Sequence, residues 1–139
     1  MEVRLATLDD FEQFLQIKEE FYKEYGVSKK TKEFIFSEFK EYLRYAIFIA
    51  KEEGKIIGYL CGIIEENPYE IYGNMGEAFV KKEYRNKGIS TKLKDKFLDF
   101  LKNKGINLCR LDVNPDNPAQ DVYKKWGFKI DKYRMSLKI

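Results

Sequence analysis

The residues from Val80 to Lys104 constrain the fold most, because a strand-like stretch there runs through a basic loop directly into a helical pattern. The loop, KKEYRNKG, contains a single glycine, Gly88. Apolar residues then recur three or four positions apart, which is the spacing of a helix with one buried face. These positions are Ile89, Leu93, Phe97, Phe100 and Leu101. A strand joined to such a helix is typical of a mixed α/β domain.

Two helices are expected before this unit. A short strand over residues 2–6 leads to a helix that Thr7 caps, with Asp9 and Asp10 in the first turn, where the helix dipole favours anions. A second helix is expected over residues 32–44. Both carry an apolar stripe along one side, as helices that cover a sheet do.

The remaining segments are predicted to be strands and one short helix. The expected elements are a hairpin over residues 45–64 that turns at Glu53-Gly54, a strand that ends at Val80, a buried strand over residues 106–113, a helix from Asn117 to Trp126, and a final hairpin over residues 128–139. Together these elements predict one mixed α/β domain over residues 1–139, built around a single sheet.

The composition excludes several classes of active site. The chain has 139 residues and a net charge of +3, and it contains no histidine. Without histidine, Ser-His-Asp catalysis, Cys-His catalysis and zinc sites with imidazole ligands are excluded. No metal site is expected. Cys61 and Cys109 lie in apolar runs and are expected to be buried free thiols, which suits the cytoplasm. The longest apolar run, Ile56 to Ile64, is too short to cross a membrane. A soluble cytoplasmic protein without membrane contact is expected.

Positive charge is concentrated between Lys81 and Lys104, where nine basic residues face three acidic ones. This segment therefore carries +6, and the rest of the chain −3. A helix start with free N–H groups is a site for phosphate, and Gly88 lets the backbone approach a ligand closely. A solvated basic helix is the alternative explanation. A nucleotide-binding P-loop is excluded, because NKGISTK lacks its paired glycines and the lysine that follows the second one.

Two motifs resemble those of the GNAT superfamily of acetyl-CoA-dependent N-acyltransferases. The residues RNKGIS, Arg85 to Ser90, resemble the family signature (Q/R)-x-x-G-x-(G/A), with serine in the last small position. The residues NPAQDVYKKWGF, Asn117 to Phe128, resemble the second family block, although Asn117 lies one residue nearer Tyr123 than is usual. The resemblance implies the GNAT fold. Its sheet is mixed but mostly antiparallel, with about six or seven strands, about four flanking helices, and a splay between the fourth and fifth strands.

The resemblance also implies acetyl-CoA as the acetyl donor. The N–H groups of the signature loop would bind its pyrophosphate, lysine and arginine side chains would add charge, and the pantetheine arm would pair with the end of the preceding strand. Cofactor-binding residues are therefore expected at Phe79, Val80, Lys81, Lys82, Arg85, Asn86, Lys87, Gly88, Ile89, Ser90 and Asn117.

The implied reaction is direct attack of a primary amine on the thioester, in a ternary complex. By resemblance, Tyr123 is the candidate that protonates the departing thiolate, although a tyrosine in this helix could equally be a core aromatic. Glu77, on the strand beside the thioester, is the candidate base, with a solvent-facing strand glutamate as the alternative. The acceptor would be a small cationic amine or a protein amino group.

The acceptor would lie against the first two helices and the loop after residue 64, which are rich in carboxylates and aromatic rings. The carboxylates are Asp9, Asp10, Glu19, Glu20, Glu24, Glu65, Glu66 and Glu70. A non-catalytic acyl-CoA sensor is the main alternative function. A nucleic-acid-binding module is less favoured, because Phe97 and Phe100 belong to the apolar stripe of their helix. The oligomeric state stays open, and a homodimer is one possibility.

Overall fold

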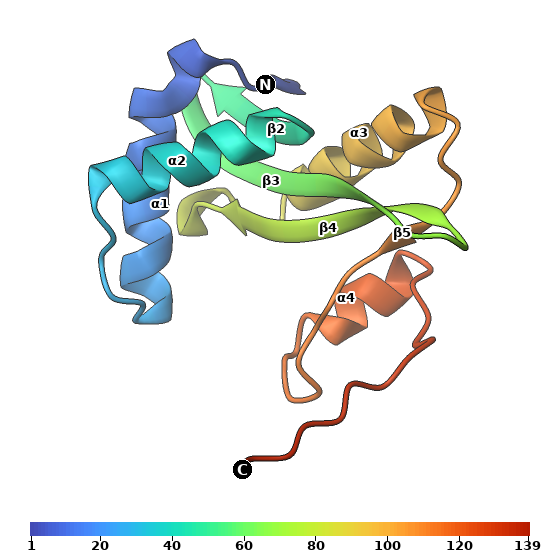
Figure 1. Ribbon diagram of the computed structural model, residues 1–139. Coiled ribbons are helices and arrows are strands. Elements are labelled where there is room, and N and C mark those ends of the chain that lie inside the picture. Colours follow the sequence, from blue (N-terminus) through green and yellow to red (C-terminus); the bar gives the residue numbers. More distant parts are fainter.

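A five-stranded sheet with the order β1-β2-β3-β4-β5 forms the centre of the fold (Figure 1). The computed structural model describes residues 1–139. Strands β1 to β4 pair antiparallel, and β5 pairs parallel to β4. The strands are β1 (Glu2–Leu5), β2 (Ala46–Glu52), β3 (Lys55–Glu66), β4 (Ile71–Val80) and β5 (Cys109–Arg110). The predicted mixed α/β sheet is confirmed.

Helices cover both faces of this sheet. Helices α1 (Phe11–Tyr25) and α2 (Lys32–Leu43) lie on one face, α3 (Ile89–Asn103) lies on the other, and α4 (Gln120–Lys125) lies beyond β5 (Figure 1). Strand β3 is buried on both faces, since Tyr59 belongs to the core under α1 and α2, whereas Leu60 belongs to the core under α3. Its continuous apolar run is therefore that of a central strand. None of the helices has the length and apolar character needed to cross a membrane.

Helix α3 approaches the sheet closely at two glycines. A Cβ atom at Gly62 of β3 would lie 2.3 Å from the ring of Phe97, and one at Gly73 of β4 would lie 2.3 Å from a methyl group of Leu101. A larger residue at either position would force the side chain of Phe97 or Leu101 out of its present place in the core. The two glycines therefore allow the side chains of α3 to pack directly on the backbone of β3 and β4.

Strand β4 contains a bulge where it passes β3. Leu60 pairs with Ala78 and Gly62 pairs with Met75, so Gly76 and Glu77 together oppose the single residue between Leu60 and Gly62. A bulge of this kind shifts the alternation of side chains by one residue. Met75 consequently lies in the core under α3, whereas the side chain of Glu77 turns toward α1.

The C-terminal part of the chain differs from the prediction. The buried strand expected over residues 106–113 is reduced to Cys109–Arg110, and the final hairpin over residues 128–139 is not formed. The sheet therefore has five strands rather than the about six or seven that the resemblance implied. A strand needs a neighbour to complete its hydrogen bonds, and residues 128–139 run extended away from the open edge of β5 without pairing with it (Figure 1).

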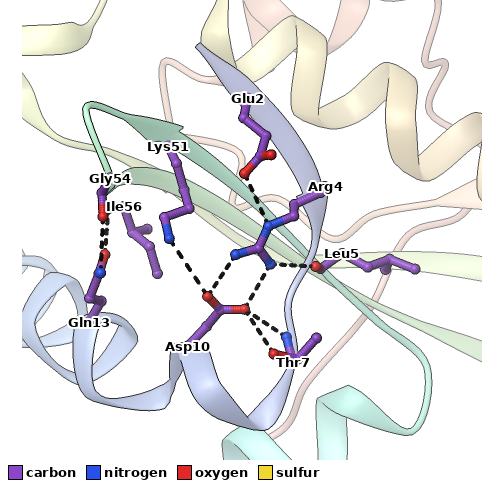
Figure 2. A network of polar contacts seen from close by, with 9 residues as sticks. All are labelled: Glu2, Arg4, Leu5, Thr7, Asp10, Gln13, Lys51, Gly54 and Ile56. Atoms are coloured by element: carbon purple, nitrogen blue, oxygen red, sulfur yellow. Dashed lines mark hydrogen bonds and ion pairs between the residues drawn. The ribbon is translucent and has the colours of Figure 1, made fainter.

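Asp10 lies in a polar network that joins the first strand to α1 (Figure 2). Its carboxylate accepts two hydrogen bonds from the Arg4 guanidinium, at 2.8 and 2.9 Å, and a third from the Thr7 N–H at 2.8 Å. The Lys51 ammonium lies 4.0 Å away. The hydrogen bonds from Arg4 are the main cause that lowers the pKa of Asp10 from 3.8 to about 2. Asp10 is therefore a structural anion of the fold and not part of an acceptor site.

Replacing Asp10 by asparagine is expected to lower the free energy of unfolding by about 2 kcal/mol at pH 7, since the pKa of this carboxyl is lower in the folded chain. This contribution is complete above about pH 4 and is lost as the pH falls toward 2. Denaturant unfolding at several pH values measures it. The control is Asp9→Asn, because Asp9 is exposed in the same turn. A difference between wild type and Asp10→Asn that persists at pH 2 would contradict the assignment.

Candidate active site

The site is a cleft that opens where β4 and β5 separate. The two strands pair only at Gly73 with Cys109 and at Asn74 with Arg110. Beyond Asn74 the remaining half of β4 has no neighbour on that edge, and a cleft of about 500 Å³ opens there. The predicted splay between the fourth and fifth strands is confirmed. The cleft is lined by the second half of β4, the loop before α3, the segment after β5, and α4.

Seven of the eleven residues predicted to bind the cofactor line this cleft, and four do not. The seven are Phe79, Val80, Arg85, Asn86, Gly88, Ile89 and Ser90. The four that lie outside its lining are Lys81, Lys82, Lys87 and Asn117. The side-chain oxygen of Asn117 accepts a hydrogen bond from the N–H of Ala119, at 2.9 Å, and so forms the turn before α4. Its position in the second motif is thus explained by local structure.

The loop before α3 presents a row of backbone donors to the cleft. Asn86 and Gly88 both have the left-handed backbone conformation, with φ of 62° and 77°. The first helical hydrogen bond runs from the N–H of Lys92 to the carbonyl of Gly88. The N–H groups of residues 86–91 donate no hydrogen bond within the chain. Six successive N–H groups without a partner in the chain, at the positive end of a 15-residue helix, are suited to bind an anion.

Arg85 is held by α1. Its guanidinium donates to both carboxylate oxygens of Glu24, at 2.8 and 2.7 Å, and its Nε donates to the carbonyl oxygen of Val80 at 2.8 Å. The same group lies 5.3 Å from the centre of the Phe79 ring. The side-chain charge of Arg85 is therefore matched within the chain. Its contacts tie the loop to α1 and to the end of β4, which leaves the backbone of the loop to face a ligand.

Tyr123 of α4 lies in the wall of the cleft. Its ring also packs against Trp126 and Phe128, with ring centres 5.8 and 6.4 Å apart. Burial, followed by the nearby Tyr25 hydroxyl, raises the pKa of Tyr123 above its ordinary value. A phenol in such surroundings keeps its proton at neutral pH and can donate it. The residue thus serves the packing of α4 and reaches the cleft as well.

Glu77 lies on the other side of β4. Its carboxylate forms an ion pair with Lys18 of α1, at 2.5 Å, and accepts a hydrogen bond from the hydroxyl of Tyr59. Glu77 and Lys18 border a second, smaller cavity of about 40 Å³ between α1, α2 and β4, which Glu38 and Tyr42 also line. The site of Glu77 is therefore separate from the lining of the large cleft, although Tyr59 contributes to both.

Lys18 is almost fully buried, with 7 % of its side chain exposed. Burial opposes its charge, but the hydrogen bond and the charge of Glu77 outweigh this effect, so the pKa of Lys18 lies above its ordinary value. Burial, the charge of Glu77 and the hydrogen bond raise the pKa of Tyr59 as well. The group is thus an ammonium, a carboxylate and a neutral phenol that hold one another in place.

The comparisons with known proteins agree with this geometry. The model of the acetyltransferase (GNAT) family matches residues 11–128. The chain belongs to the GNAT family. Among curated relatives, an uncharacterized N-acetyltransferase of Methanocaldococcus jannaschii is 27% identical over 135 residues, and the match covers 91% of this chain and 60% of the relative. N-alpha-acetyltransferase 30 of Schizosaccharomyces pombe is 32% identical over 83 residues, which cover 58% of this chain and 55% of the relative.

Solved structures share the fold of this GNAT chain. Aminoglycoside N-acetyltransferase AAC(6')-Iy, solved with a CoA bisubstrate analogue, has a TM-score of 0.84 at 18% identity, and the match covers 99% of this chain and 97% of that one. The ribosomal-protein-alanine N-acetyltransferase of Brucella melitensis has a TM-score of 0.81 at 15% identity, with both chains fully covered. Identities this low establish the shared fold alone.

Several residues of this GNAT site were not predicted from the sequence. Ala119 and Trp126 share a helix face with Tyr123, so the second motif already contained the signal for them. Tyr25 at the end of α1 was expected only as one of the aromatic residues near the acceptor, and it lines the large cleft. Lys18 gave no signal, since it meets Glu77 only through the packing of α1 on the sheet.

The carboxylates expected to form an open acidic acceptor surface are mostly paired with cations. Glu19 pairs with Lys29, Glu20 with Lys81, and Glu70 with Arg110. Glu24 and Asp10 are paired with arginines as described above. The predicted acidic surface is therefore largely neutralised, and two of its carboxylates, Glu20 and Glu24, are paired with Lys81 and Arg85 of the basic loop.

Replacing Gly88 by asparagine is expected to weaken the binding of CoA at least about tenfold, measured by calorimetric titration. Asparagine tolerates the left-handed backbone at this position, and its side chain would occupy the open space in front of the loop donors. The control is Gly105→Asn at the other end of α3, where φ is 76° and the space is equally open. Equal affinities of the two variants would show that the loop does not hold the phosphates.

Proposed function

We propose that residues 1–139 form one acetyl-CoA-dependent N-acetyltransferase domain, which transfers an acetyl group to a primary amine in a ternary complex. The observation that carries the proposal is the cleft between β4 and β5, with six free N–H donors at its α3 end and Tyr123 in its wall. The donors suit a pyrophosphate, and the unpaired edge of β4 suits the amide groups of a pantetheine arm. Membership of the GNAT family supports the same assignment.

Acetyl-CoA is a substrate that supplies the acetyl group as an activated thioester. The chain provides the groups that move protons while the amine nitrogen gains its bond to the acetyl carbon and the carbon–sulfur bond breaks. We assign Glu77 to take the proton that the amine loses, through a water held in the 40 Å³ cavity beside it. One water needs only about 10–15 Å³ of such space. Tyr123 donates a proton to the departing thiolate, and the two residues return to their starting states by exchange with solvent.

The acceptor would reach the site from the side of α1 and α2. Because most carboxylates on α1 are paired with cations, a polycationic small molecule finds few free anions there. We therefore favour a protein amino group as the acceptor. Two similar proteins, an N-alpha-acetyltransferase and a ribosomal-protein-alanine N-acetyltransferase, support this choice.

An acyl-CoA sensor without catalysis is the alternative function. It would use the same cleft and loop, and it would need no proton donor beside the thioester. Turnover of acetyl-CoA with a panel of peptides and small amines separates the two functions. Release of CoA that depends on an amine supports the transferase, whereas tight binding without turnover on every amine supports the sensor.

The Tyr123→Phe variant is expected to lower kcat about a hundredfold, at the low end of general acid catalysis, since thiolates are good leaving groups. Folding and CoA affinity should change little, because phenylalanine keeps the ring contacts with Trp126 and Phe128. The raised pKa predicts that activity of the wild type falls only above the ordinary tyrosine pKa of about 10. The control is Tyr69→Phe, whose ring is 95 % exposed. If the Tyr123→Phe variant keeps the kcat of the wild type, Tyr123 does not act as an acid and its role is structural only.

The Glu77→Gln variant is expected to lower the rate most with acceptors of high pKa. An α-amine, with a pKa near about 8, is partly neutral at physiological pH, whereas a lysine amine near about 10.4 needs a base. Rates with two peptides, one offering each type of amine, measure the difference. Glu41→Gln on the exposed face of α2 is the control. An equal loss with both amines would assign to Glu77 the structural task of neutralising Lys18.

A further inference from the structure

The buried ammonium of Lys18 takes no part in the proton transfers assigned to Glu77 and Tyr123. Lys18 lies in the apolar stripe of α1, four residues after Phe14 and four before Tyr22, and all three side chains are buried. Burying a charge is costly, and apolar residues of similar volume in place of a buried ion pair are often neutral or stabilising. The stability of the core therefore does not by itself explain a lysine at this position.

The surroundings of the Lys18 ammonium direct it to one carboxylate. Its Nζ lies 2.5 Å from Oε1 of Glu77, which is its only ion-pair partner. It otherwise faces aromatic rings, with the ring centres of Phe21 and Tyr22 both 4.8 Å away. The faces of these rings attract a cation. The rings and the ion pair together hold the ammonium in one place beside Glu77.

The two carboxylate oxygens of Glu77 differ in their contacts. Oε1 accepts hydrogen bonds from both the Lys18 ammonium and the Tyr59 hydroxyl, whereas Oε2 accepts none within the chain. The side chain of Glu77 is 30% exposed, and no buried side-chain oxygen of the protein lacks a partner, so Oε2 is accessible to solvent. In the structural carboxylate of Asp10, by contrast, both oxygens accept hydrogen bonds from Arg4 (Figure 2). Glu77 thus has one oxygen that is held and one that is free.

We propose that Lys18 is a positioning residue, which holds Oε1 of Glu77 so that Oε2 is the atom that takes the proton. This inference rests on the base role proposed for Glu77. In the transfer, the amine gives its proton to the water in the 40 Å³ cavity, the water gives one of its own protons to Oε2, and Oε1 keeps its two hydrogen bonds. A base must lie within hydrogen-bond reach of the proton that it removes, so a carboxylate that turns freely would be a poorer base.

A double-mutant cycle on the rate of acetyl transfer tests this role. With a peptide that offers a lysine amine, Lys18→Met is expected to lower kcat by a factor of about 10 to 100, since small displacements of a reacting group have effects of this size. In the Glu77→Gln background the same change should cause no further loss, because no base remains to be positioned. The KM for acetyl-CoA should not change, because neither side chain lines the large cleft.

The matched control is Lys23→Met on the same helix, where the lysine is exposed, and this variant should keep the wild-type rate. Methionine suits the apolar stripe of α1 and is unbranched like lysine, so the variants should fold. A loss in the double variant beyond that of Glu77→Gln, as large as the loss caused by Lys18→Met alone, would show that Lys18 acts through the fold and would overturn the proposal. A wild-type kcat in the Lys18→Met variant would also overturn it.

Crystal structures of the wild type and of Lys18→Met provide a measurement that does not depend on turnover. The Glu77 carboxylate is expected to turn toward solvent in the variant, since only Tyr59 still holds it. A carboxylate that keeps its wild-type orientation would overturn the proposal, whatever the rate. A carboxylate that turns, together with a wild-type rate for Glu77→Gln, would confirm that Lys18 orients Glu77 but would refute the base role of Glu77.

Discussion

The separation of β4 from β5 is the constraint on which the rest of the site depends. Two residue pairs join the strands, and the ladder then ends at Asn74. Half of β4 is left with unpaired backbone groups in the interior of a sheet, which would be costly without a ligand or solvent to satisfy them. An extended, amide-containing molecule in the cleft can satisfy these groups, and the N–H donors of the neighbouring loop suit a negatively charged end of such a molecule.

The position of that loop depends on contacts at both ends. The glycines of β3 and β4 let α3 lie close to the sheet, and the Arg85–Glu24 pair ties the start of the helix to α1. The bulge in β4 adds a second consequence, because it turns Glu77 toward Lys18 and away from α3. Strand β4 thus has two roles. Its free edge presents backbone groups to the large cleft, and its face presents the Glu77 carboxylate to the smaller cavity.

Local sequence signals predicted much of this architecture. The turn at Glu53-Gly54 and the start of α3 after Gly88 follow from glycines that favour these conformations, and both are as expected. The bulge, the Lys18–Glu77 pair and the Glu24–Arg85 pair could not be predicted, since each joins residues that meet only through tertiary packing. The C-terminal residues show the same limit, because their alternation indicates a strand but not which edge the strand joins.

The central claim is that the N–H groups of residues 86–91 and the free edge of β4 hold acetyl-CoA. Backbone amide NMR spectra with and without CoA test it most directly. The account predicts that the amide signals of residues 86–91 and of the second half of β4 shift most strongly on binding, and that these amides become protected from exchange. Binding of CoA with the largest shifts on α2 or on the outer strands, and none in the loop before α3, would contradict the account.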